Sequence, residues 1–134
     1  MPGAGTGPND EIVQLVIKRA AGGSEEDPAV CEHCSEPLKG ERGRDWVIHH
    51  RRPRRRGGSR LPDTNHPQNL VAVCAASHDE IESHRADALA HGWLLHAKDD
   101  PLHRPILLYR GSRWAYLTAD AAISDTPPRE EGWR

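Results

Sequence analysis

Residues 45–50 read DWVIHH, residues 69–74 read NLVAVC and residues 77–91 read SHDEIESHRADALAH. The first two stretches are rich in β-branched and other apolar side chains, which is typical of short strands. The third begins with Ser77, a residue type that caps helices well, and Glu80 follows three residues later, as a capping box requires. This part of the chain is therefore predicted to run strand, long loop, strand, helix.

Two further elements flank this unit. Residues 10–21 are predicted to form a helix, because Asn9 can cap its start and Gly22-Gly23 can end it. Residues 106–109 and 114–118 are rich in apolar and aromatic side chains, flank a short glycine-containing turn and are predicted to form a closing β-hairpin. Together these elements predict an α+β fold.

The chain has 134 residues, which suits one domain. We expect a disordered tail at residues 1–8, a domain at residues 9–118 and a C-terminal tail at residues 119–134. The sequence contains no Phe, and a core this thin often needs support from a metal or a partner. Its start lacks the pattern of a signal peptide, and no apolar run approaches the ~20 residues of a membrane span, so a cytoplasmic protein is expected.

Positive charge is concentrated in the long loop. The formal net charge is only -2, yet eight Arg and a single acidic residue, Asp45, lie between Arg42 and Arg60. Guanidinium groups bind phosphates in a forked geometry, so this block suits a polyanion such as DNA. A solvated basic loop without a partner is the alternative interpretation.

Histidine and asparagine stand where the predicted strands and helix meet. His49 and His50 end the first strand, Asn69 starts the second, and His78 lies at the top of the helix. Cleavage of a phosphodiester needs a base that activates water, a cation at the leaving oxygen and a group that holds the base. Imidazole suits the first two tasks. Adjacent histidines can take different roles where a strand ends, as Pro53 indicates here.

These residues resemble the HNH endonuclease family, whose core is the ββα-metal fold. The resemblance covers roughly residues 12–118, and its main motifs are His49-His50-Arg-Arg-Pro53, Gly57-Gly58, Asn65, Asn69-Leu-Val-Ala-Val-Cys74 and His78. Further motifs resemble small HNH proteins of phages that infect high-GC bacteria, namely Cys31-x-x-Cys34, Glu82-Ser-His84-Arg85 and Gly92-Trp93. The resemblance implies a metal-dependent DNA endonuclease, acting in the host cytoplasm if a phage encodes it, with the phage packaging machinery as a further partner.

The resemblance also implies a role for each motif residue. His50 matches the general base, Asn69 the residue that braces the loop and orients this base, and His49 and His78 the ligands of a divalent ion, which can be Mg, Mn, Ni or Zn. The second helix ligand is left open between Glu82, which follows His78 by four residues, and His84, which follows it by six. Either can instead be an ordinary surface residue. Asn65 and His66 are expected only to shape the loop.

Contacts with DNA are expected from arginines on the loop and the helix. Arg85 stands seven residues after His78 and is expected to return to the metal face, where it can hold the scissile phosphate. The residues expected to bind phosphates are Arg51, Arg52, Arg54, Arg55, Arg56 and Arg85.

A structural zinc site is also implied, in altered form. Related proteins hold zinc with two Cys-x-x-Cys knuckles, whereas this chain offers Cys31, Cys34 and Cys74, with Ser77 at the expected fourth position. Serine is a poor ligand beside thiolates. His33 or a water can complete the site, or the site can be empty.

Two rival functions share these residues. The first is a non-catalytic DNA-binding module that keeps the HNH fold, and the second is a small zinc-stabilised interaction protein. Intact His50, Asn69 and His78 favour the enzyme over both.

Overall fold

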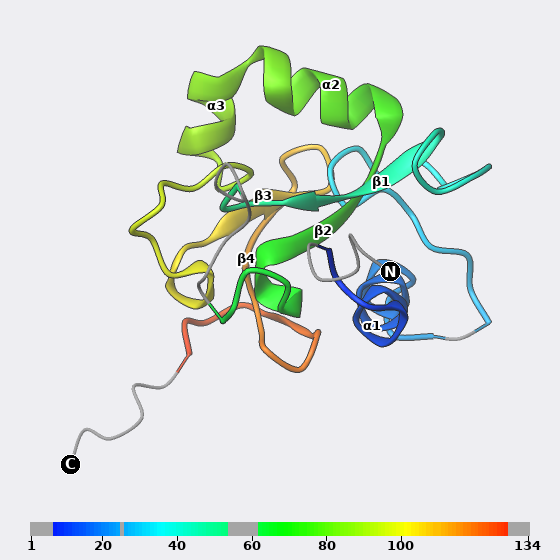
Figure 1. Cartoon of the computed structure of the whole chain (residues 1–134), viewed down its shortest axis with the longest axis horizontal. Coiled ribbons are helices and arrows are strands. Elements are labelled where there is room, and N and C mark those ends of the chain that lie inside the picture. The colour runs from blue at the N-terminus through cyan, green and yellow to red at the C-terminus, as the bar shows by residue number, and fades with distance from the viewer. Residues whose placement is uncertain (1–6, 25, 54–61, 129–134) are drawn as a thin grey trace.

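The structure is a computed structural model that describes residues 7–24, 26–53 and 62–128. Its elements in chain order are α1 Asp10–Ala20, β1 Trp46–His50, η1 Pro67–Asn69, β2 Leu70–Cys74, α2 Ala75–Ser83, α3 Arg85–Ala90, η2 Pro101–His103, β3 Ile106–Leu108, β4 Arg113–Leu117 and β5 Ile123–Ser124 (Figure 1). Within these residues, no helix is long and apolar enough to cross a membrane.

Strands β1 and β2 form an antiparallel pair, and α2 follows β2 without a loop (Figure 1). The pairing runs from Trp46 opposite Cys74 to His50 opposite Leu70. This confirms the predicted order of strand, strand and helix, and it is consistent with a ββα core.

Strand β2 is buried on both faces. Val71 and Val73 pack in the larger core cluster with Ile81 of α2. Alternate positions of a strand point to opposite sides, so Leu70 and Ala72 lie in a second cluster, with the buried side chains of α1. Both faces of β2 are thus covered by helices, and the start of α2 is set against the strand pair.

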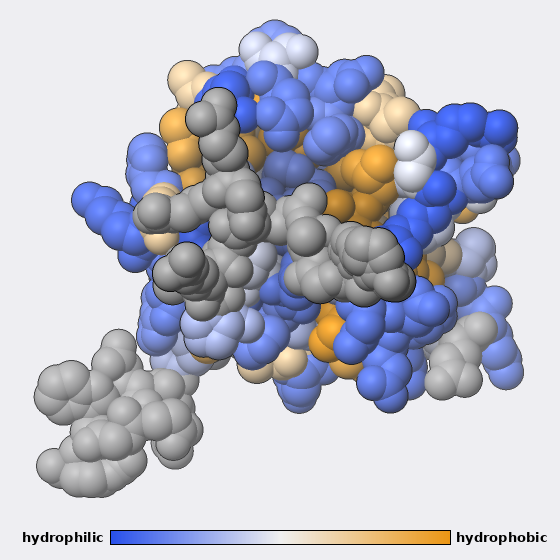
Figure 2. Space-filling model, in the orientation of Figure 1, coloured by the Kyte–Doolittle hydropathy of each residue, from blue (hydrophilic) through white to orange (hydrophobic). Residues whose placement is uncertain are grey.

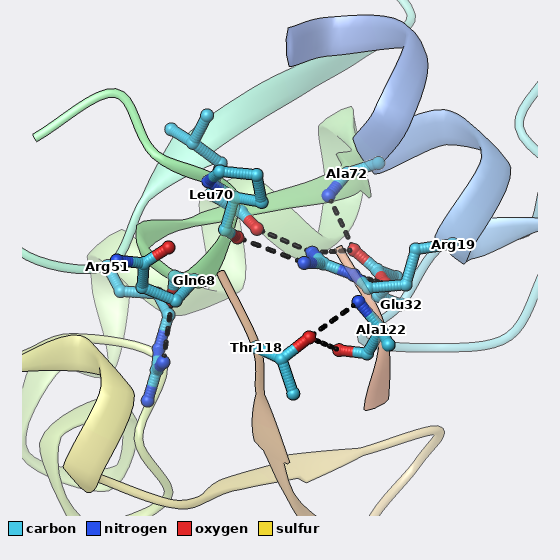
Figure 3. Close-up of polar contacts among 9 residues, drawn as sticks. Arg19, Glu32, Arg51, Gln68, Leu70, Ala72, Thr118 and Ala122 are labelled. Carbon is cyan, nitrogen blue, oxygen red and sulfur yellow. Dashed lines mark hydrogen bonds and ion pairs between the residues drawn. The ribbon is translucent and has the colours of Figure 1, made fainter. Parts of the chain in front are cut away.

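Helix α1 forms as predicted. The side chain of Asn9 accepts a hydrogen bond from the backbone of Ile12 at 2.9 Å, which satisfies one of the free N–H groups of the first turn. Its buried Arg19 forms an ion pair with Glu32 at 2.9 Å and donates to the carbonyl of Leu70 at 2.5 Å (Figure 3). The carboxylate of Glu32 in turn accepts from the backbone of Ala72 at 3.0 Å. This buried pair fixes β2 from its α1 side.

The predicted helix at residues 77–91 is wrong in two respects. It begins at Ala75, because the sulfur of Cys74 accepts from the backbone of Ser77 at 3.4 Å and acts as the cap. It also breaks at His84, where φ is -122° and ψ is 63° and the ring lies 3.3 Å from the carbonyl of Glu80. Side chains that bond to the local backbone compete with helical hydrogen bonds. Ser77 is therefore inside the first turn, and α3 is a separate helix.

The predicted C-terminal hairpin is present and gains a third strand. β3 pairs with β4 in antiparallel fashion, and β4 pairs with β5, which lies in the stretch that was expected to be a tail. The buried side chains of β3 and β4 join the larger core cluster, so this sheet closes one side of the ββα unit. On the face seen in Figure 2, hydrophilic residues dominate and hydrophobic ones show in smaller separate areas.

Candidate functional site

Three of the predicted metal ligands converge beside α2. His49 of β1 and His78 and Glu82 of α2 each offer one ligand atom, and these atoms all lie within 4.8 Å of one another. Because His78 and Glu82 are four residues apart, they share one face of the helix, with 3.9 Å between Nε2 and Oε2. Two imidazoles and a carboxylate are a donor set that suits a divalent cation.

The ring of His49 is oriented for metal binding. Its Nε2 lies 2.8 Å from the backbone oxygen of Trp93, which can only accept, so Nε2 carries the proton and the lone pair is on Nδ1. Metal-binding histidines usually donate their other N–H to such a carbonyl. Burial lowers the pKa of His49 to about 4, and the ring is therefore neutral at neutral pH, as a ligand must be.

Glu82 is shared between His78 and Arg85. Nη1 of Arg85 donates to Oε1 of Glu82 at 2.7 Å, while the other carboxylate oxygen faces His78. The break at His84 means that Arg85 does not continue α2, so the helical phase expected for it was wrong. It nevertheless lies at the edge of the cluster.

His84 is not part of this group. It stands between α2 and α3, bonds to the carbonyl of Glu80, and lines a hollow of about 410 Å³ together with His33 and His91. The structure thus pairs His78 with Glu82 rather than with His84 among the described residues.

The expected base, His50, is half-buried and contacts a residue that was expected only to shape the loop. Nε2 of His50 lies 2.8 Å from Oδ1 of Asn65. Asn69 is fully buried, and its side chain bonds to the backbone of Arg52 and Thr64. It therefore braces both ends of the long loop, as expected, but the side chain that meets the His50 ring is that of Asn65. In the sequence, Asn65 was one of the motif residues of the resemblance, but nothing there linked it to His50.

The expectation that Arg51 binds phosphate is wrong, because its guanidinium is fully buried. Burial lowers the pKa of Arg51 to about 9, so the group remains charged at neutral pH. It donates to backbone carbonyls of Gly92 at 2.8 Å, Gln68 at 2.9 Å (Figure 3), Arg104 at 2.9 Å and Pro101 at 3.2 Å.

Arg52 requires the same correction. It is buried, forms an ion pair with Asp63 and donates to the carbonyl of Asp99 at 2.8 Å. Both arginines come directly after β1, and the backbone N–H of Arg51 still donates to the carbonyl of Asn69. The chain has therefore not yet left the interior at these two residues, and both side chains are buried. Counting charges along the sequence could not reveal this. The expected phosphate contacts of Arg54, Arg55 and Arg56 lie outside the described residues.

The second cluster contains the three cysteines, all of them free thiols. Ligand atoms of Cys31, Cys34 and Cys74 lie within 4.8 Å of one another, and the sulfurs of Cys34 and Cys74 are 3.7 Å apart. The hydroxyl of Ser77 lies 3.3 Å from the sulfur of Cys31 and 3.4 Å from that of Cys74, so it stands where a fourth thiolate is expected. His33 lies behind it, with Nδ1 3.1 Å from this hydroxyl.

Burial raises the pKa of the Cys31 thiol to about 11. A metal can bind the Cys31 sulfur only after the thiol loses its proton, and the raised pKa makes this loss less favourable. Three sulfurs fit a thiophilic ion such as zinc, but the fourth position holds a weak ligand.

The family comparison agrees with this geometry. Residues 31–83 match the family model described as HNH endonuclease, and this part of the chain is an HNH endonuclease domain. The matched stretch contains both clusters, His50 and Asn69, whereas Arg85 lies just beyond it. No match was found among curated proteins or among solved structures.

Proposed function

We propose that this protein is a metal-dependent endonuclease that hydrolyses phosphodiester bonds of DNA. The observation that carries the proposal is the convergence of His49, His78 and Glu82, with His50 as the next residue after His49 on β1, within a stretch that matches the HNH endonucleases. A water-activating base next to a cation site is the minimum that phosphodiester hydrolysis needs.

Each residue has a defined task in this proposal. His49, His78 and Glu82 would hold a divalent cation, which can be Mg, Mn, Ni or Zn and which supplies charge stabilisation at the leaving oxygen. His50 accepts a proton from the attacking water. The water oxygen forms a bond to phosphorus, the bond from phosphorus to the leaving oxygen breaks, and that oxygen ends protonated from solvent. Asn69 holds the backbone at Arg52 and at Thr64, on either side of the loop that follows His50 in the sequence.

DNA would be held through its backbone. Arg85, at the edge of the cluster, and Arg54, Arg55 and Arg56 of the loop offer guanidinium groups to phosphates, which are alike in every sequence. The resemblance to small phage HNH proteins supports a setting in phage DNA processing beside the packaging motor.

A plasmid assay tests this function. The full chain is incubated with supercoiled DNA and Mg, Mn, Ni or Zn in turn, with chelator as the control. We expect nicked or linear product with at least one metal and none with chelator. DNA binding without cleavage under every metal would instead support the non-catalytic DNA-binding module.

A further inference from the structure

Two neighbouring histidines are held in the same way by different partners. The ring of His49 donates from Nε2 to the backbone oxygen of Trp93 at 2.8 Å, and Nε2 of His50 lies at the same 2.8 Å from the side-chain oxygen of Asn65. An amide oxygen only accepts, so Nε2 of a neutral His50 carries the proton and its lone pair is on Nδ1. The Nδ1 lone pair of His49 can therefore bind a cation. The Nδ1 lone pair of His50 can accept the proton of the attacking water in the proposed function.

We propose that Asn65 is the positioning residue of the catalytic base, setting the tautomer and the ring orientation of His50. This rests on the proposed function of His50. The family resemblance gives the task of orienting the base to Asn69. The proposal gives this task to Asn65, which was expected only to shape the loop. An orienting partner matters because the wrong tautomer puts the proton on the nitrogen that must accept one.

Asn65 itself is held on both sides. On one side, the carbonyl of Thr64 accepts from Nδ2 of Asn69 at 2.9 Å, and Asp63 is paired with the buried Arg52. On the other side, the backbone of His66 donates to the carbonyl of Asp63 at 3.1 Å.

The following turn is fixed as well. The backbone of Asn69 donates to the carbonyl of His66 at 2.9 Å, and the buried Arg51 binds the carbonyl of Gln68. Buried Asn69, Arg51 and Arg52 thus fix the backbone around Asn65, and Asn65 fixes the ring. Asn69 therefore acts on His50 indirectly, because it holds the backbone next to Asn65, the residue that contacts the His50 ring.

The test uses the full chain and two substitutions at one position. Asn65→Ala removes the acceptor, while Asn65→Asp keeps an oxygen at the same distance from the backbone. His66→Ala, an exposed neighbour in the same loop, is the matched control. Four quantities are measured: the tautomer of the His50 ring from imidazole ¹⁵N shifts at a pH where it is neutral, the cleavage rate, Mn²⁺ affinity by calorimetry, and the melting temperature.

We expect wild type to hold His50 with the proton on Nε2, and Asn65→Ala to shift the ring toward a mixture of tautomers. Cleavage should fall about 10–100-fold, a part of the whole contribution of a general base, with unchanged Mn²⁺ affinity. Asn65→Asp should restore the tautomer and most of the rate, and His66→Ala should resemble wild type in all four measurements.

Three results would overturn the proposal: a wild-type ring protonated on Nδ1, an Asn65→Ala protein with unchanged tautomer and rate, or equal losses in Asn65→Ala and His66→Ala. If wild type cleaves no DNA at all, the proposed function fails, but the tautomer measurement still decides whether Asn65 orients the ring. The two failures are therefore distinguishable.

Discussion

Helix α2 begins between two clusters of candidate metal ligands, the histidine cluster of His49, His78 and Glu82 and the cysteine cluster of Cys31, Cys34 and Cys74. The two clusters differ in the ligands that they offer. Ser77 faces the cysteines and His78 faces His49, although the two residues are adjacent, because successive helix positions are about 100° apart. The histidine cluster offers three good donors, with a carbonyl that orients His49. The cysteine cluster has a hydroxyl in its fourth position.

The two clusters also differ in how far they are exposed to solvent. The histidine cluster is partly open, with Glu82 and His78 exposed enough to meet a substrate, whereas Cys31 is fully buried. Changes in the first cluster should therefore alter chemistry and leave folding intact. Changes in the second should alter stability and leave chemistry intact. The predictions below challenge or refine this division, from the largest expected effect to the smallest.

The largest effect is expected for the base. His50→Ala should lower the cleavage rate by about 10²–10⁴-fold, the usual contribution of a general base, because the proposed mechanism assigns the proton of the attacking water to this ring. Circular dichroism and Mn²⁺ calorimetry on the same preparation should match wild type. Cleavage close to the wild-type rate would remove His50 from the mechanism.

Loss of metal ligands should come next. His49→Ala and His78→Ala should weaken divalent metal binding by more than the about 10–100-fold that outer-shell partners contribute, and cleavage should fall with it. Glu82→Gln should have a smaller effect in the same direction, since its carboxylate is partly neutralised by Arg85.

Glu80→Gln is the matched control, because Glu80 lies on the same helix but outside the cluster. Calorimetric titration with Mn²⁺ measures each affinity. Unchanged binding in all the ligand variants would place the metal elsewhere.

The third prediction concerns the cysteine cluster. Ser77→Cys should complete a four-thiolate site, so the protein should bind one zinc and melt at a higher temperature with zinc than with chelator. Complete zinc sites contribute on the order of 10 kcal/mol in small peptides, and less is expected here because the domain folds around two core clusters of its own.

The helix cap is not lost by this substitution, since Cys74 provides it. Cleavage should not change. Elemental analysis and melting curves measure the outcome, and tight zinc already present in wild type would mean that His33 or another residue completes the site.

The fourth prediction compares the contribution to DNA binding of the two buried arginines with that of the three arginines that follow Pro53. Replacing Arg54, Arg55 and Arg56 with Gln should flatten the plot of log K for DNA against log salt by up to about three units, at about 0.9 per phosphate contact. Arg51→Gln and Arg52→Gln should instead lower the melting temperature without flattening the slope, because their guanidinium groups are buried. Binding measured at several salt concentrations decides this, and the reverse pattern would refute it.

The smallest effect is expected for Arg85. Its exposed ion pair with Glu82 is worth at most about 1 kcal/mol of folding free energy, so Arg85→Gln should leave the melting temperature nearly unchanged. If Arg85 binds a phosphate, the salt slope should fall by about one unit. Salt titrations of DNA binding measure this slope, and an unchanged slope would remove Arg85 from the DNA surface.

The sequence by itself located most of the elements and named the candidate ligands that both clusters bring together. Apolar runs, turn residues and capping signals located α1, the β1–β2 pair and the C-terminal hairpin, since these signals depend on residues that are near in sequence. The i and i+4 spacing made Glu82 one of the two candidates for a partner of His78, and the structure groups His78 with Glu82. Ser77 was recognised as the altered zinc position, although its assignment as the helix cap was wrong because a cysteine sulfur takes that role.

Only the tertiary structure decided what the loop residues do. Arg51 and Arg52 look like the start of a basic loop, yet their partners are carbonyls and a carboxylate up to 54 residues away, which no local pattern reports. The same holds for Asn65, whose oxygen meets His50 only because buried Asn69 and Arg52 hold the backbone beside it. A buried charge must find fixed partners, and these partners come from the fold rather than from neighbours in the sequence.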